Sequence, residues 1–266
     1  KIEKNNLPED AGDFLWRVAK DSANYSFNKS HSIAYATLAA WTTYLKFNHP
    51  QQFFLALLKM AYHEPSPQKE IQKISQELPR FNIKLLPPNL FKSEFNFSLE
   101  GKNIRYGLKN IKGISSKSLD ALTEFRGATI VNKYDIFLFS KQSGINIGVL
   151  SALIQAGALS EGEERSRLVL EAQLFNILTD REKRHIIALG EKFQYDLVEC
   201  IKRSVEEQTL GDNNKPIITE KRYETLKKRY EPYKQIYLKN KTHEKFANWY
   251  FENKLLGYSH STTLDK

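Results

Sequence analysis

Four consecutive residues, Asn28, Lys29, Ser30 and His31, place an amide, an ammonium, a hydroxyl and an imidazole at the expected start of a helix. The first turn of a helix has backbone N–H groups without an internal partner, and the helix dipole is positive there. Ser30 or Ser32 can cap such a helix. Together these groups suit a phosphate. The alternative is a capped helix start whose polar side chains face water.

A second group combines a glycine with two lysines and two serines between short helical segments. A glycine turn between helices presents successive backbone amides, and flanking lysines add positive charge, which is the chemistry of a helix-hairpin-helix contact to a DNA backbone. The usual turn has a second glycine where Ser115 stands, and a plain helix–helix turn is the alternative. The segment consists of Lys112, Gly113, Ile114, Ser115, Ser116 and Lys117.

Two weaker patterns follow. The stretch "QAGALS", residues 155–160, places Gly157 in a similar turn after an apolar helix and predicts a partner hairpin. The stretch "QYDLV" has Gln194, Asp196 and Leu197 in the order of short peptides that dock in ring-shaped sliding clamps. The alternative for the second stretch is an amphipathic helix that buries Tyr195 and Leu197.

A row of apolar and aromatic residues occupies the basic C-terminal region at alternating three- and four-residue steps. Aromatic side chains on a basic helix can stack on bases, but this spacing is more typical of a packing face. The row consists of Tyr223, Leu226, Tyr230, Tyr233 and Tyr237.

The elements that must position these groups are mostly helices. Apolar periodicity predicts helices over 8–24, over the segment that follows His31, and from Pro50. A polar helix is expected near 66–80. Alternating runs around "EGKN" predict a β-hairpin after Pro87 and Pro88. Short helices broken by glycines follow, then two helices within 165–204, a linker near 206–220 and a helical basic tail over 219–255.

Composition favours a globular protein with an anionic partner. The chain has 266 residues, 41% hydrophobic, and a formal charge of +9, which favours polyanions but says nothing of the fold. A single cysteine, Cys200, excludes an internal disulfide, and no Cys/His spacing indicates zinc. We expect a cytoplasmic protein, because no apolar stretch approaches the roughly 20 residues of a membrane span and no signal peptide is apparent.

Catalytic motifs are missing from the sequence. Two-metal phosphoryl transfer needs clustered carboxylates, whereas no Asp-x-Asp pair occurs and the closest two aspartates are Asp10 and Asp13. No P-loop, GxSxG or HExxH motif is present. We therefore expect no catalytic residue and no metal ligand in this chain, which reads as a piece of a longer one.

The order of these pieces resembles the C-family replicative DNA polymerases, specifically the bacterial DNA polymerase III alpha subunit. "YSFNKSHSIAY" is similar to the fingers motif of that family, with Ser26 in place of a glycine. "NIKLLPPNLFKSEFNFSL", "IRYGLKNIKGIS" and "VLSALIQAGALS" resemble successive passages up to the end of the helix-hairpin-helix region, and "ENKLLGYSHS" the approach to the OB domain. The matches cover about 10–160 and 245–262.

The resemblance implies a mainly α fragment of a DNA-directed DNA polymerase: the end of the fingers (1–90), a β-hairpin with a tandem helix-hairpin-helix domain (91–205), and a linker and basic tail (206–266). It implies that Asn28 to His31 meet the triphosphate of the incoming dNTP, and that the glycine turns hold primer–template duplex. Mg²⁺ and its palm aspartates, like the PHP domain, would lie outside this chain, which alone would be inactive.

Two alternatives remain at this stage. The chain could be a stand-alone, non-catalytic helix-hairpin-helix protein that binds DNA. It could also be a scaffold whose basic tail contacts other proteins. A sliding clamp is a further candidate partner, although "QYDLV" lacks the aromatic end of the usual clamp motif.

Overall fold

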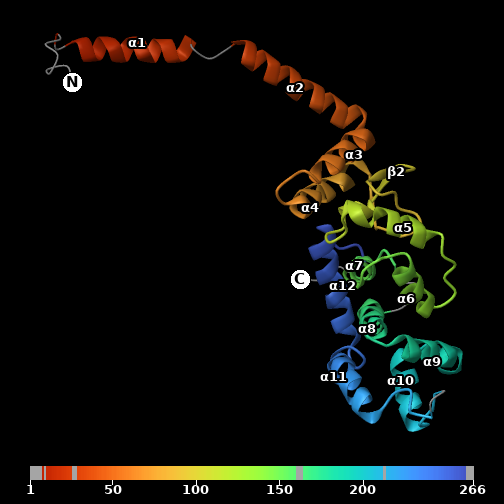
Figure 1. The fold of residues 1–266 in the computed structure, drawn as a ribbon. Helices are drawn as coiled ribbons and strands as arrows, with labels where there is room; N and C mark the ends of the chain where they lie inside the picture. Colours follow the sequence, from red (N-terminus) through yellow and green to blue (C-terminus); the bar gives the residue numbers. More distant parts are fainter. Residues whose placement is uncertain (1–7, 9, 26–28, 160–163, 212–213, 262–266) are drawn as a thin grey trace. The chain divides into compact units, whose positions relative to one another are not determined.

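The computed structural model describes residues 8, 10–25, 29–159, 164–211 and 214–261. Within these residues the chain is mainly helical with one small sheet, as the sequence predicts (Figure 1). The chain divides into two units, residues 1–53 and 54–266, and each is described by itself. Among the described residues, no helix combines the length and the apolar content needed to cross a membrane.

The first unit contains α1 (Ala11–Tyr25), α2 (Lys29–Asn48) and the start of α3 (Pro50–Ala61). The predicted helix over 8–24 and the predicted start at Pro50 are confirmed. The capping prediction is wrong: α2 begins at Lys29, so Ser30 and Ser32 lie inside its first turns and not at the cap. The large apolar side chains of α1 and α2 are largely exposed, with Trp16 at 75% and Trp41 at 64%.

The second unit begins within α3, where Phe54, Leu58 and Ala61 are buried one helical turn apart. Short 3-10 turns precede or follow several helices: η2 (Leu78–Phe81), η3 (Leu108–Asn110), η4 (Ser116–Ser118) and η5 (Glu191–Phe193). The remaining α-helices are α4 (Pro67–Glu77), α5 (Leu119–Arg126), α6 (Lys133–Gln142), α7 (Ile147–Gln155), α8 (Arg165–Asn176), α9 (Asp180–Gly190), α10 (Leu197–Glu206), α11 (Glu220–Ile236) and α12 (Lys241–Leu256).

The small sheet has the strand order β1-β3-β2. Strands β2 (Ser98–Glu100) and β3 (Asn103–Arg105) form the predicted antiparallel hairpin, and Gly101 at φ 60° occupies a left-handed position in its turn. Strand β1 (Leu85–Leu86) pairs with β3 in parallel. The sequence indicated only an extended segment for β1, because two residues are too few for a recognisable alternation.

Residues 165–204 form three helices, so the prediction of two is wrong. The additional helix end comes from a capping box at Thr179, whose hydroxyl accepts a hydrogen bond from the N–H of Glu182 while the Glu182 carboxylate accepts one from the N–H of Thr179. A second start lies at Asp196, whose carboxylate accepts the N–H of Glu199. Both are local cues that the apolar periodicity alone does not reveal.

The tail is helical, as predicted, but Asn240 begins a separate helix by accepting the N–H of Thr242. The aromatic row on α11 is a packing face in part. Leu226 is fully buried, Tyr230 is 4% exposed, and the Tyr230 hydroxyl donates to Tyr223 at 3.0 Å. Helix α12 then returns to the middle of the unit and packs against α4, α7 and α8 (Figure 1).

Candidate nucleic-acid interface

The turn at Gly113 joins η3 to η4 and α5, and most of its residues are exposed. Gly113 has φ 97°, a left-handed conformation that favours glycine. A Cβ added there would meet only the Ala152 Cβ, at 3.9 Å. Glycine is therefore required by the backbone conformation and not by crowding.

Two isoleucines hold this turn to the core. Ile111 is 1% exposed and Ile114 is 6% exposed, and the N–H of Ile114 donates to the carbonyl of Ile111 at 3.1 Å. Between and beyond these anchors the chain faces solvent: Lys112, Gly113, Ser115, Ser116 and Lys117 are all exposed. Alternating anchors and exposed residues fix the turn so that its polar edge points outward.

The exposed edge offers donors suited to an anion. The N–H of Ser118 donates to the carbonyl of Ser115. The amides of Ser116 and Lys117 come before it in the first turn of η4, where backbone N–H groups have no partner within the helix. Lys112 and Lys117 add charges on either side of the turn. Amides and flanking ammonium groups can together hold a phosphate.

Ser115 stands where the usual turn has a glycine, and its backbone is not strained. Its backbone has φ −102° and ψ 164°, an extended conformation that any residue adopts. The second glycine of the usual turn is therefore not required by this backbone, and the departure does not weaken the candidate site.

Helix α12 supports the turn from the other side. The N–H of Lys112 donates to the carbonyl of Leu255 at 3.0 Å. The buried Tyr106 hydroxyl lies 3.1 Å from the carbonyl oxygen of Asn110 and 3.0 Å from that of Leu256. The sequence does not reveal this support, because a contact between residues 150 positions apart leaves no local pattern.

The turn at Gly157 is of a different kind. It ends α7 with φ 75°, and the N–H groups of Gly157 and Ala158 donate back to the helix carbonyls. The Arg165 guanidinium covers it, with Nη2 2.5 Å from where a Gly157 Cβ would lie. The carbonyl of Ala158 accepts the N–H of Leu90. This geometry favours a structural role for Gly157, and its predicted DNA contact stays a prediction.

Arg165 is held by a buried carboxylate. Glu252 is fully buried and also accepts hydrogen bonds from Ser259 and Ser261 and from the backbone of His260. Burial would raise the pKa of Glu252, but His260, Ser261 and Arg165 more than offset this and hold that pKa below its ordinary value. Burial lowers the pKa of His260.

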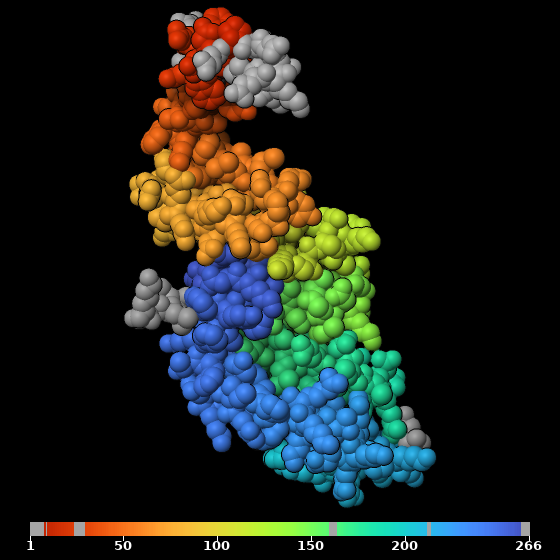
Figure 2. Space-filling view, turned by 90° about the vertical axis from the view of Figure 1, so that its left-hand side faces the viewer, coloured from red at the N-terminus to blue at the C-terminus, as the bar shows by residue number. Residues whose placement is uncertain are grey.

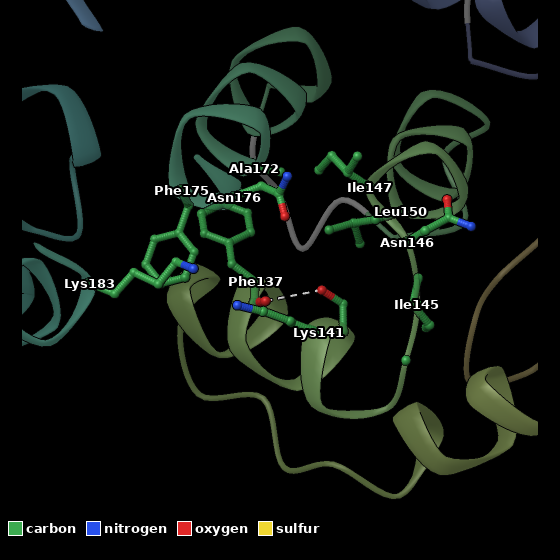
Figure 3. Close-up of a pocket in the computed structure, with 12 residues that line it drawn as sticks. Phe137, Lys141, Ile145, Asn146, Ile147, Leu150, Ala172, Phe175, Asn176 and Lys183 are labelled. Carbon is green, nitrogen blue, oxygen red and sulfur yellow. Dashed lines mark hydrogen bonds between the residues drawn. The ribbon is translucent and has the colours of Figure 1, made fainter. Parts of the chain in front are cut away.

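A cavity of about 360 Å³ lies among α6, α7 and α8, with Lys183 of α9 at one side (Figure 3). Its floor is apolar, with Phe137 and Phe175 close together. The Lys183 ammonium lies 5.7 Å from the centre of the Phe175 ring, and it shares Asp180 with Lys141 at 3.7 and 3.9 Å. Burial and the neighbouring Lys141 lower the pKa of Lys183.

The predicted nucleotide group belongs to the first unit. Lys29, Ser30 and His31 form the first turn of α2, and Asn28 lies outside the described residues. Ser30 and His31 are exposed, and the His31 ring lies 4.3 Å from that of Tyr35 one turn later. The backbone thus places three of the four predicted residues at one helix start, and their nucleotide role stays a prediction.

Two of the predicted clamp-binding residues, Asp196 and Leu197, have structural roles. Gln194 is exposed at φ 51°, but Asp196 caps α10 and pairs with Arg167 at 2.6 Å. Leu197 is fully buried, and the Tyr195 ring packs edge-on against Tyr134. This arrangement favours the structural alternative, because a buried leucine is not presented to a partner.

Comparisons with known proteins agree with this geometry. Residues 82–168, which include the Gly113 and Gly157 turns, match the model of the helix-hairpin-helix motif family. The chain is 32% identical over 176 residues, 63% of its length, to the DNA polymerase III subunit alpha of Aquifex aeolicus, and 35% identical over 150 residues, 55% of its length, to that of Halalkalibacterium halodurans. It is also 28% identical over 59% of its length to an error-prone DNA polymerase of Corynebacterium diphtheriae.

These matches span only 13% to 14% of each relative's own length. The sequence identities confirm the resemblance to the DNA polymerase III alpha subunit. The structure and the family match confirm a mainly helical fold with a helix-hairpin-helix region. The matches concern a small portion of proteins that are much longer than this chain.

Proposed function

We propose that this chain is a segment of a DNA-directed DNA polymerase that acts in replication and that it grips primer–template duplex through the Gly113 turn. The observation that carries the proposal is the open edge of this turn, anchored by Ile111 and Ile114 and flanked by Lys112 and Lys117. The similarity to DNA polymerase III alpha subunits supports the choice of partner.

The contact would not depend on base sequence. Backbone amides and lysines at the turn reach phosphate oxygens, which carry no sequence information. Displacing counterions from the duplex makes such binding weaker as salt rises. A polymerase segment behind the active site needs this property, because every sequence must pass through it.

The second part of the proposal concerns the incoming dNTP. Asn28, Lys29, Ser30 and His31 would meet its triphosphate at the start of α2. Lys29 would neutralise charge that develops on the departing pyrophosphate, and His31 would donate a hydrogen bond to it. The backbone placement of Lys29 to His31 in one helical turn supports this.

The chemical step would belong to the longer polymerase. Among the described residues, no group of three or more His, Cys, Asp or Glu side chains is arranged to hold a metal ion. The two Mg²⁺ ions that such a reaction uses would be held by carboxylates elsewhere in the longer protein. We expect the 266-residue chain alone to bind DNA without extending it.

Duplex binding at several salt concentrations tests the proposal. The logarithm of the association constant should fall linearly with the logarithm of the salt concentration, equally for duplexes of unrelated sequence. Affinity that does not change with salt would contradict phosphate gripping and would favour the scaffold alternative.

A further inference from the structure

Helices α4 and α12 enclose a groove of about 450 Å³ in the second unit. Figure 2 shows the blue α12 lying directly against the orange segment that contains α4. The groove lies within the size range of ligand clefts, about 300–1,000 Å³. Its main lining residues are Lys69, Gln72, Trp249, Tyr250, Asn253 and Lys254.

The chemistry of this groove suits bases and phosphates together. Tyr250 is 45% exposed and Trp249 is half-buried, so both rings offer surface to a ligand. The Lys254 ammonium lies 5.7 Å from the centre of the Tyr250 ring, and Lys69 is exposed on the α4 side. The lining also has three amide side chains, those of Gln68, Gln72 and Asn253, and the described lining residues include no carboxylate.

The groove adjoins the Gly113 turn. Lys112 donates its N–H to Leu255, the residue after Lys254. The amide of Gln68, next to Lys69 on α4, lies 3.4 Å from the carbonyl oxygen of Asn110. A strand of nucleic acid leaving the turn would therefore meet this groove next.

We propose that the α4–α12 groove binds a single-stranded stretch of nucleic acid that continues from the duplex held at the Gly113 turn. Bases stack on Trp249 and Tyr250, and Lys69 and Lys254 neutralise the adjacent phosphates. A duplex does not satisfy this site, because its bases are already stacked on one another. The inference rests on the proposed function and extends it.

The test compares two fluorescently labelled DNAs bound by the 266-residue chain: a blunt duplex and the same duplex with a single-stranded overhang. The chain should bind the overhang DNA more tightly. Tyr250→Ala should weaken binding of the overhang DNA by about 5- to 150-fold, the usual effect of removing one stacking ring, and should leave blunt-duplex binding unchanged.

Phe91→Ala is the matched control. Phe91 is an aromatic residue of the same unit, 44% exposed, and it does not line the groove, so its loss should alter neither affinity. An equal loss of both affinities in Tyr250→Ala, or no loss, would overturn the inference. Failure of the proposed function is distinguishable, because it would appear as unchanged blunt-duplex binding in Gly113→Ala.

A second measurement keeps Tyr250 and Trp249 intact, so it does not depend on whether the Tyr250→Ala variant folds. With Trp16 and Trp41 replaced by phenylalanine, Trp249 is the remaining tryptophan. A single-stranded oligothymidylate should quench its emission, because the bases stack on the indole. Unchanged emission at concentrations that saturate overhang binding would refute a role for Trp249.

Discussion

The Arg165 guanidinium and the Glu252 carboxylate form a buried ion pair beside the Gly157 turn, with Nη1 2.5 Å from Oε1. The pair joins the start of α8 to the end of α12, and the same carboxylate holds residues 259–261. It fixes the direction in which the chain leaves α12, and several expectations follow from it.

Glu252→Gln should lower the free energy of unfolding by about 3–5 kcal/mol, because it leaves the Arg165 charge buried without its partner. Chemical denaturation of the 266-residue chain measures this. Glu70→Gln is the control: its pair with Lys73 is exposed, and its loss should cost less than about 1 kcal/mol. Equal effects of the two substitutions would show that burial of the Glu252 pair does not matter.

Stability should fall on acidification in two stages. The pKa of His260 is lowered from 6.5 by burial, so the unfolded chain takes up this proton first and stability declines as the pH drops below about 6.5. The pKa of Glu252 is lowered from 4.5, so its contribution is complete above about pH 4.5 and is lost as the pH falls further. His260→Asn should reduce the first stage to the part that His185 contributes, because burial lowers the pKa of His185 too. It should also raise the pKa of Glu252, because the charge of His260 helps to lower that pKa. Denaturation midpoints across this pH range would reveal a single stage if the assignment is wrong.

Gly113→Ala should weaken duplex binding for every sequence. The backbone at this position has φ 97°, and an alanine held in that conformation costs about 1–3 kcal/mol of strain. Gly144→Ala is a matched control: Gly144 also has a positive φ, with nothing within 4 Å of an added Cβ, and it lies in another turn. Both variants should lose similar stability, and only the first should lose affinity. A sequence-dependent loss would argue against backbone gripping.

Lys112→Ala and Lys117→Ala should each reduce the slope of the salt dependence of duplex binding by about 1. Lys202→Ala serves as control, since Lys202 pairs with Glu206 on α10, away from the turn. Binding isotherms at four or more salt concentrations give the slopes. Unchanged slopes in the first two variants would remove these lysines from the interface.

Lys29→Ala, made in the polymerase that contains this chain, should raise KM for dNTP or lower kcat, because a charge next to the triphosphate is lost. Lys46→Ala removes the same charge near the other end of α2 and should alter neither constant. Steady-state kinetics on primed template measure both. Normal kinetics for Lys29→Ala would refute its nucleotide role.

The sequence allowed much of this fold to be predicted, because helices such as α3 carry their own apolar periodicity and start signal at Pro50. The β2–β3 hairpin could also be predicted, from the alternation of apolar and polar residues in its two strands and from the turn that contains Gly101. Strand β1 and the split of 165–204 into three helices depend on a parallel pairing and on capping at Thr179, which are hard to recognise in one sequence.

The candidate site was only partly predictable. The residues of the Gly113 turn stand together in the sequence, so their chemistry could be read directly. The sequence does not show that the Arg165 side chain covers Gly157, because Arg165 is held there by Glu252, which lies 87 residues further along the chain. The α4–α12 groove could not be predicted either, because the residues of its two helices are about 180 positions apart in the sequence.

The hydrogen bonds of Tyr106 and Lys112 to the end of α12 also affect how the protein is made. A ribosome releases the Gly113 turn long before Leu255 and Leu256 exist, so during synthesis the turn lacks part of its backing. Such high contact order slows folding and makes α12 the last of the described helices to dock. We therefore expect the nascent chain to acquire its grip on DNA only after α12 has left the exit tunnel.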